Sequence, residues 1–333
     1  MTAEDTLSQL NRLVRAKTGD PTARAHSLEV LPGHAGFSYS FVLDRTDGGR
    51  PAGKMVVRLA PPGVKISGPA DIVRQARIMS SMAGTDVPVP PIYWYGDEPE
   101  FFGRPYSIVG FLDGFKLSDS ERPLDELKPY ARMGIEMLAA LHNLPWEPRR
   151  DAFGDPLPLT EEFKRLDYLL DRPTLDPAVV ARAPELRERL RATIPATPRI
   201  GCVHGDFQWA NVLFDQRRPV ALIDWEIALI GPVLLDLGWV CFFGDAESWL
   251  ANATTRVRPL TPDEIVAVYS RAAARPVDAN EVRWFRAFAG YRFGVITCFN
   301  LMLHRRGKRH DPEWEDLAVS APRMFERALE LLG

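Results

Sequence analysis

The sequence has few cysteines, no long hydrophobic run without charges, and no excess of charge of either sign. Its 333 residues include three cysteines, which are far apart and outside any CxxC motif. This pattern excludes a disulfide framework and a Cys/His metal cluster, and it favours reduced, buried thiols in a cytoplasmic protein. The 41 basic and 44 acidic residues give a net charge of −3. Neither nucleic acid nor an anionic membrane surface is therefore an expected partner.

No segment has the pattern of a signal peptide or of a membrane span. The first 20 residues are polar and amphipathic and lack an apolar core. The most apolar window, residues 220–243, contains Asp224, Glu226 and Asp236. Burying three carboxylates in a bilayer would cost several kcal/mol, at about 2.5 kcal/mol or more for each. We therefore expect no membrane-spanning helix.

The order of strand and helix patterns predicts a bilobal α+β fold. Five strand-like segments and one helix, at 70–84, lie within residues 28–112, so residues 1–112 are expected to form a small β-rich lobe with one inserted helix. Helical patterns dominate beyond the flexible residues 110–117, so residues 113–333 are expected to form a larger, mostly helical lobe. A cleft between two such lobes is a natural place for a ligand.

In the larger lobe, apolar periodicity predicts a helix that ends before Pro145 and a proline-rich surface loop at 146–160. Two short strands are expected at 212–214 and 220–224. Further helices are expected at 161–171, 184–194, 232–243, 262–274, 280–303 and 320–332.

Polar residues interrupt the apolar stretch VHGDFQWANVLF at 203–214. Asp206 and Asn211 either hold a turn together or bind a ligand. If the two short strands pair as a hairpin, Asp224 at the end of the second lies on the same edge as Asp206 and Asn211. Two carboxylates and an amide oxygen at one point suit Mg²⁺, which prefers hard oxygen ligands. Asn211 and Asp224 would bind the ion, and Asp206 would accept a proton from a substrate hydroxyl.

Three motifs in this order resemble the aminoglycoside phosphotransferase and choline kinase-like family. They are HGDxxxxN from His204 to Asn211, IDW around Asp224, and DLGW around Asp236. The small-lobe segments MVVRLAPPG, VPVPPIYWYGD and GRPYSIVGFLDG extend the resemblance over nearly the whole chain. They are similar to the subgroup related to the phosphotransferase domain fused to some acyl-CoA dehydrogenases.

The resemblance implies a protein-kinase-like fold and an ATP-dependent kinase, with GTP as the alternative nucleotide, that uses Mg²⁺ to transfer a γ-phosphoryl group to a small-molecule hydroxyl acceptor. It implies that Asp206 is the catalytic base, that Asn211 and Asp224 are the magnesium ligands, and that His204 and Asp236 support the loop.

The resemblance also implies a nucleotide site in the small lobe. Arg58 stands where such kinases place a phosphate-gripping lysine, and Gln75 stands where they place its glutamate partner. The remaining positions are Gly33 and Gly36, in a turn over the phosphates, and Gly110 and Phe111, in the hinge that would meet the purine. Because Gln75 is neutral and cannot neutralise Arg58, a second interpretation stays open. In it the chain is a catalytically weak or inactive kinase-like module that binds a nucleotide or metabolite.

The acceptor is expected to bind the helical segments 160–195 and 280–304. The second segment and the residues just beyond it contain one acidic residue, Glu281, and five arginines: Arg283, Arg286, Arg292, Arg305 and Arg306. This balance favours a neutral or anionic acceptor, such as a hydroxyacyl compound, over a polycationic aminoglycoside. Arg286 and Arg292 either face the acceptor pocket or lie on a solvated helix face, and the solvated face is the expectation because arginine is usually exposed. The aromatic residues of the same helix, Trp284, Phe285, Phe288 and Tyr291, are expected in its core.

Overall fold

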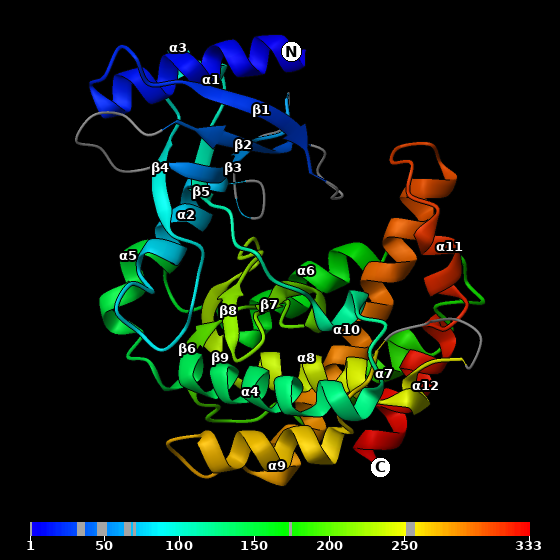
Figure 1. Ribbon diagram of the computed structural model, residues 1–333. Helices are drawn as coiled ribbons and strands as arrows, with labels where there is room; N and C mark the ends of the chain where they lie inside the picture. The colour runs from blue at the N-terminus through cyan, green and yellow to red at the C-terminus, as the bar shows by residue number, and fades with distance from the viewer. Residues whose placement is uncertain are drawn as a thin grey trace. The chain divides into compact units, whose positions relative to one another are not determined.

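The structure is a computed structural model of residues 1–333, shown in Figure 1. It describes residues 2–31, 37–44, 52–62, 68, 71–172, 175–250 and 257–333. The chain divides into two compact units. The first comprises Met1–Gly114, Asp151–Phe153 and Val220–Ile227, and the second comprises Phe115–Arg150, Gly154–Pro219 and Ala228–Gly333. The N-terminal region is built on a β-sheet and the C-terminal region is mainly helical, which confirms the predicted fold class.

The first unit contains a five-stranded antiparallel sheet in the order β1-β2-β3-β5-β4. Its strands are β1 (Ala25–Val30), β2 (Ser38–Leu43), β3 (Gly53–Leu59), β4 (Ile92–Gly96) and β5 (Tyr106–Gly110). In the central strand β3, Arg58 pairs with Ser38 on one side and with Ser107 on the other. This position holds the Arg58 backbone rigidly in the middle of the sheet.

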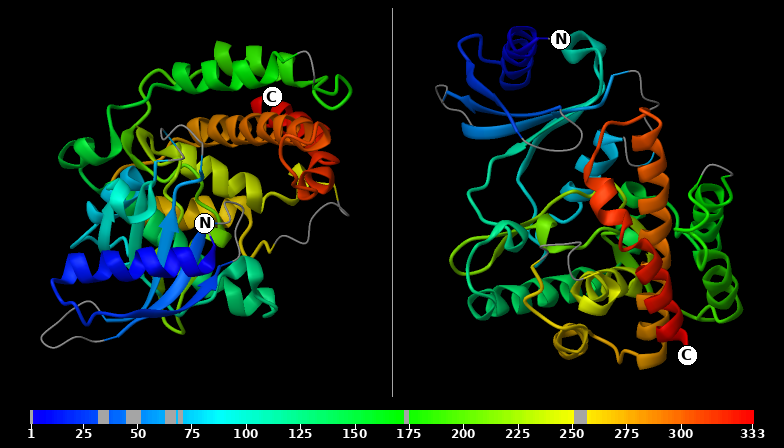
Figure 2. Two further views of the ribbon diagram at one scale, coloured as in Figure 1. Left: turned by 90° about the horizontal axis from the view of Figure 1, so that it is seen from above. Right: turned by 90° about the vertical axis from the view of Figure 1, so that its right-hand side faces the viewer.

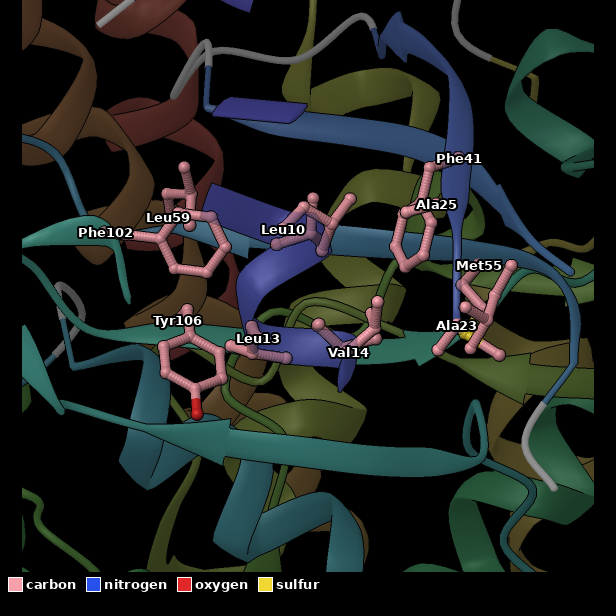
Figure 3. Close-up of a cluster of buried hydrophobic side chains, with 13 residues drawn as sticks. Leu10, Leu13, Val14, Ala23, Ala25, Phe41, Met55, Leu59, Phe102 and Tyr106 are labelled. Carbon is pink, nitrogen blue, oxygen red and sulfur yellow. The ribbon is translucent and has the colours of Figure 1, made fainter. Parts of the chain in front are cut away.

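Helix α1 (Ala3–Thr18) covers one face of this sheet. A capping box between Thr2 and Asp5 starts the helix, and Gly19 ends it in the left-handed conformation. Leu10 and Leu13 of the helix pack with apolar side chains of the strands in a buried cluster (Figure 3). Because successive side chains of a strand point to opposite faces, Val57 enters this cluster and Arg58 points away from it.

The other face of the sheet carries α2 (Ile72–Ser80), the one inserted helix that the sequence predicts, and it packs against β4 and β5. Asp71 caps its first turn by accepting a hydrogen bond from the Arg74 backbone N–H. Gln75 is buried on this helix, on the side of the sheet to which Arg58 points. A short helix, α3 (Pro99–Phe102), occupies the turn between β4 and β5.

The second unit consists mainly of helices, with one short strand pair, β6 (Ile200–Val203) and β9 (Leu229–Pro232), wholly inside it. The helices are α4 (Leu124–Asn143), α6 (Leu159–Leu170), α7 (Ala183–Ala192), α8 (Leu234–Gly244), α9 (Pro262–Ala272), α10 (Ala279–Arg305), α11 (Glu313–Ala318) and α12 (Ala321–Leu332). Strands β6 and β9 pair antiparallel. Strands β7 (Val212–Phe214) and β8 (Pro219–Leu222) pair in the predicted hairpin.

The core of the second unit is built around α8 and α10. Every residue of α8 is buried, as its apolar sequence requires. Gly238 allows the close approach of the two helices, since a Cβ there would lie 2.4 Å from the Phe285 carbonyl oxygen. Helix α12 packs along α10, as the orange and red helices show in both views of Figure 2. Trp284, Phe285, Phe288 and Tyr291 are buried, so the predicted aromatic core of α10 is confirmed.

Some elements differ from the sequence prediction. The expected loop at 146–160 contains a 3₁₀ turn (Glu147–Arg149) and the short helix α5 (Arg150–Phe153). Phe153 is buried and packs edge-to-face on Trp225, and Asp151–Phe153 belongs to the first unit. The pair β6–β9 and helix α11 were not predicted. Among the described residues, no helix is both long and apolar enough to cross a membrane.

Candidate active site

A loop from His204 to Asn211 joins β6 to β7 in the second unit. Strand β6 is pinned by β9, with Cys202 opposite Ile230, so the loop starts from a buried and fixed point. Gly205 has a φ of 88°, a conformation that a residue with a side chain rarely adopts. The loop then closes with a single 3₁₀ turn, Trp209–Asn211.

Asp236, in the first turn of α8, holds the start of this loop. Its Oδ2 accepts the His204 backbone N–H at 2.7 Å, and its Oδ1 accepts the Gly205 backbone N–H at 2.7 Å. The Asp236 side chain is fully buried. Burial opposes the ionised carboxylate, but hydrogen bonds from His142 and from the His204 backbone outweigh it and lower the pKa of Asp236.

His142 of α4 supports Asp236 from behind. Its Nε2 lies 3.2 Å from Asp236 Oδ2, and its Nδ1 lies 2.7 Å from the Tyr269 hydroxyl oxygen. Burial lowers the pKa of His142, which keeps the ring neutral. The carboxylate requires a proton on Nε2, so Nδ1 accepts a hydrogen bond from the Tyr269 O–H. His142 is therefore a core residue of the second unit.

His204 is fully buried within the loop itself. Its Nδ1 accepts the Asp206 backbone N–H at 3.3 Å, and its ring packs edge-to-face on Phe207 at 6.5 Å. The ring is therefore engaged with the loop backbone and with a core aromatic residue.

The Asp206 carboxylate accepts hydrogen bonds from three side chains. Gln208 Nε2 donates to both oxygens at 3.1 and 3.0 Å, and Asn211 Nδ2 donates to Oδ2 at 2.9 Å. Trp239 Nε1, from α8, donates to Oδ1 at 2.9 Å. Donors on both sides of the carboxylate fix its plane.

Asn211 is oriented by two hydrogen bonds from one amide nitrogen. Besides the Asp206 carboxylate, Nδ2 donates to the Asp206 backbone carbonyl at 2.9 Å. The amide nitrogen is therefore directed at Asp206, and the carbonyl oxygen Oδ1 points to the other side of the amide. Asn211 is 7% exposed.

The first unit holds the other predicted residues. Asp224 has a left-handed backbone with a φ of 65°, and its Oδ1 lies 4.0 Å from Arg58 Nη1. Within the described part of the chain, that buried oxygen accepts no hydrogen bond. Arg58 Nη1 also donates to Gln75 Oε1 at 3.2 Å. Arg58 therefore lies between a carboxylate and a neutral amide, and the Arg58–Gln75 contact expected from the sequence exists.

The predicted hinge residues Gly110 and Phe111 lie at the end of β5 and directly after it. The Gly110 N–H donates to the Pro91 carbonyl at 2.8 Å, and the Phe111 N–H donates to the Lys54 carbonyl at 3.1 Å. The Lys54 ammonium lies 4.0 Å from the centre of the Phe111 ring. The predicted phosphate-covering residues Gly33 and Gly36 lie outside the described residues.

The predicted site residues therefore form two groups. His204, Asp206, Asn211 and Asp236 are brought together in the second unit. Arg58, Gln75 and Asp224 are brought together in the first. Across the described ranges, no group of three or more His, Cys, Asp or Glu side chains is arranged to bind a metal.

The sequence prediction for the arginines of α10 was wrong. Arg292 is 5% exposed, and its Nε lies 3.0 Å from Glu162 Oε1 of α6. Arg286 pairs with Asp245 at 3.2 Å, so neither side chain lies on a solvated face. Arg305 pairs with Glu315 at 2.7 Å, so counting arginines overstates the free positive charge of this helix. The available signal in the sequence was that Arg286 is next to Phe285 and that Arg292 is four residues after Phe288, both of them aromatic core positions.

The three cysteines are free and buried, as predicted. Burial raises the pKa of Cys202 to about 11 and the pKa values of Cys241 and Cys298 to about 12. These thiols are therefore protonated near neutral pH and are poor nucleophiles.

Comparison with known proteins places this site in a family context. The sequence profile of the phosphotransferase enzyme family matches residues 29–274. Acyl-CoA dehydrogenase family member 10 of Mus musculus is 26% identical over 262 residues, which cover 73% of this chain and 24% of that protein. Acyl-CoA dehydrogenase family member 11 of Gallus gallus is 22% identical over 339 residues, which cover 96% of this chain and 42% of that protein. The chain spans less than half the length of either relative.

Solved structures share the fold. A Ralstonia eutropha JMP134 protein assigned to the aminoglycoside phosphotransferases has a TM-score of 0.75 and 22% identity, covering 98% of this chain and 97% of that one. A choline/ethanolamine kinase family protein of Mesorhizobium loti has a TM-score of 0.61 and 19% identity, covering 98% and 94%. A thermostable mutant of aminoglycoside phosphotransferase APH(4)-Ia, in a ternary complex with AMP-PNP and hygromycin B, has a TM-score of 0.61 and 18% identity, covering 97% and 98%. The predicted resemblance and the protein-kinase-like fold are confirmed.

Proposed function

This chain belongs to the phosphotransferase enzyme family, and we propose that it moves the γ-phosphoryl group of ATP to the hydroxyl group of a small-molecule acceptor. The observation that carries this proposal is the Asp206 carboxylate, fixed by three side-chain donors on a loop that Asp236 anchors. Phosphoryl transfer requires mainly positioning and charge neutralisation from a protein. An oriented carboxylate can receive the proton of the attacking hydroxyl.

We propose that Asn211 and Asp224 hold Mg²⁺. Asn211 directs its amide nitrogen at Asp206, which leaves its carbonyl oxygen to act as a ligand. Asp224 offers a buried oxygen without a hydrogen-bond donor among the described residues, on a left-handed backbone. Unusual backbone conformations of this kind are concentrated at functional sites. When bound, the ion would neutralise the β- and γ-phosphate oxygens.

For the nucleotide, we propose that Arg58 binds the phosphates and that Gln75 orients it. The 3.2 Å hydrogen bond between them supports this arrangement. The Phe111 N–H donates to the Lys54 carbonyl, so the purine would bind hinge backbone groups beyond Phe111. A phosphate-covering role for the Gly33–Gly36 turn remains part of the proposal.

For the acceptor, we propose a cavity of about 280 Å³ along the C-terminal half of α10. Its lining comes from the first expected acceptor segment, with Leu175 and Asp176, and from the second segment and the residues just beyond it, with Leu301 and Arg306. Its walls also include Val179, Cys298, Met302 and Arg305. Apolar walls with the Asp176 carboxylate, the Arg306 guanidinium and an Arg305 guanidinium already paired with Glu315 suit a partly apolar acceptor that is neutral or anionic, such as a hydroxyacyl compound.

Thermal melting with Mg·ATP tests the nucleotide and metal assignments. ATP at about 100 times its dissociation constant should stabilise the parent by roughly 2.7 kcal/mol. Asp224→Ala should lose this shift, and Asp215→Ala, in the exposed β7–β8 turn, should keep it. A full shift in the Asp224→Ala variant would refute its role as a ligand.

The neutral Gln75 partner of Arg58 favours one alternative, a kinase-like binding module with weak or no catalysis. Such a module would show the Mg·ATP shift without releasing ADP in the presence of any acceptor. An enzyme would show both, so the two measurements together separate the alternatives.

A further inference from the structure

A buried ion pair joins α6 and α10 beside the Asp206 loop. Arg292 and Glu162 are 5% and 8% exposed, and Arg165 donates to both oxygens of Glu162 at 2.8 and 2.6 Å. Removing two charges from water is costly, so buried ion pairs are weak stabilising devices. Such a pair is better explained by a role in fixing the positions of neighbouring groups, and the contacts of Arg292 show which groups these are.

Arg292 makes one contact with the loop and one with Trp239 of α8. Its Nη1 donates to the Gly205 backbone carbonyl at 3.0 Å, and its guanidinium lies 4.6 Å from the centre of the Trp239 ring. The same Trp239 donates its indole N–H to Asp206 at 2.9 Å. One side chain therefore contacts both the backbone before Asp206 and a ring that orients the Asp206 carboxylate.

Gly205 is held on both sides of its Cα. Asp236 accepts its N–H, and Arg292 donates to its carbonyl oxygen, which belongs to the peptide group that leads into Asp206. Asp236 therefore fixes the peptide entering Gly205, and Arg292 fixes the peptide leaving it. Because glycine is conformationally permissive, the restraint on the peptide after Gly205 limits the positions that Asp206 can take.

We propose that Arg292, oriented by Glu162, is a positioning residue that fixes the Asp206 carboxylate through Gly205 and Trp239. This inference rests on the proposed function only in giving Asp206 a catalytic role. Through these contacts, Arg292 and Glu162 connect α6 and α10, the helices expected to bind the acceptor, with the carboxylate that would receive the acceptor proton. A displacement of about 1 Å at a reacting group can reduce the rate about 100-fold.

The same helix offers a matched control. Arg286 lies six residues before Arg292, its side chain is 11% exposed, and it pairs with Asp245. Among the described residues, its ion-pair and hydrogen-bond partners do not include the Asp206 loop. Arg286→Met removes a similarly buried ion pair from α10 without touching Gly205 or Trp239.

The first readout is independent of activity. The protein is labelled with ¹⁵N-tryptophan, and the resonance that disappears in Trp239→Phe is that of the Trp239 indole N–H. The rate at which this N–H exchanges with solvent is then measured in each variant. We expect Arg292→Met to accelerate this exchange about tenfold or more and Arg286→Met to leave it within about twofold of the parent. An unchanged rate in Arg292→Met, or equal acceleration in both variants, would overturn the inference. If Arg292→Met does not fold, Glu162→Gln/Arg292→Met removes both charges and takes its place.

The second readout is ADP release from Mg·ATP, with the best acceptor from a panel of hydroxyl compounds. We expect Arg292→Met and Glu162→Gln to lower kcat roughly 10- to 100-fold, with KM for ATP within about threefold and with Arg286→Met close to the parent. A rise in KM for ATP without a fall in kcat would overturn the positioning role. Faster exchange in Arg292→Met together with full turnover of Asp206→Asn would support the positioning of the carboxylate while refuting Asp206 as the base.

Discussion

Replacing Asp236 with alanine should destabilise the second unit strongly, because one buried carboxylate satisfies three buried donors. These are the backbone N–H groups of His204 and Gly205, both at 2.7 Å, and Nε2 of His142 at 3.2 Å. A buried donor left without an acceptor costs about 1–3 kcal/mol. Water that enters the space left by the carboxylate would recover part of the sum. We therefore expect a loss of about 3–5 kcal/mol.

Thermal melting measures this loss. In units of about 150–250 residues, 1 kcal/mol shifts Tm by roughly 2–4 °C, so Asp236→Ala should lower Tm by roughly 10 °C. Asp236→Asn keeps one acceptor oxygen and should lose roughly half as much. A Tm of Asp236→Ala within about 2 °C of the parent would refute the assignment of Asp236 as the anchor of the loop.

The remaining predictions concern acid sensitivity, thiols, the nucleotide and the acceptor. Burial lowers the pKa of His142 below its unfolded value of 6.5, so the contribution of the neutral ring to stability is complete above that pH and is lost as pH falls through the folded pKa. Between pH 7 and pH 5, the Tm of His142→Phe should therefore fall less than the Tm of the parent, and an equal fall would contradict this. The buried cysteine thiols, with pKa values of about 11 to 12, should not react with Ellman's reagent at pH 8 until the chain is denatured, and rapid labelling of the native protein would contradict their burial. Arg58→Met should raise KM for ATP about tenfold or more, as expected for one charge-assisted hydrogen bond, and Gln75→Met should raise it less; an unchanged KM in Arg58→Met would remove Arg58 from the phosphate site. Leu301→Trp should fill the α10 cavity and raise KM for the acceptor without changing KM for ATP, and an unchanged acceptor KM would place the acceptor elsewhere.

Local patterns predicted most of the fold. The alternation of β3 and the apolar spacing of α10 depend on neighbouring residues, so they can be read from sequence. Strand β6 is four residues long and pairs with β9, and 25 residues lie between the two strands. So short a strand is defined by its partner, and no local pattern indicates that partner.

The site was predictable where a motif fixes the spacing. Asp206 and Asn211 lie five residues apart, and their hydrogen bond follows from the loop between them. The burial of Arg292 was not predictable, because the acidic partner Glu162 lies on another helix and 130 residues earlier in the chain. Arginine is usually exposed, and only the tertiary structure shows that its charge is paired.

The surroundings of Arg58 follow only from the sequence and the structure together. The sequence identified Gln75 as the partner of Arg58 and showed that this partner is neutral. The structure adds that Asp224 Oδ1 lies 4.0 Å from the same guanidinium. A carboxylate near Arg58 therefore comes from the segment after β8, and the helix supplies a neutral amide.

The most direct test of the account is turnover of Mg·ATP by the parent and by Asp206→Asn with a panel of hydroxyl acceptors. Asparagine preserves the size of the side chain and removes its ability to receive a proton. We predict acceptor-dependent ADP release and a phosphorylated acceptor for the parent, and a loss of roughly 10²–10⁴-fold in kcat for Asp206→Asn, with the Mg·ATP melting shift retained. Turnover by Asp206→Asn within tenfold of the parent would contradict the account.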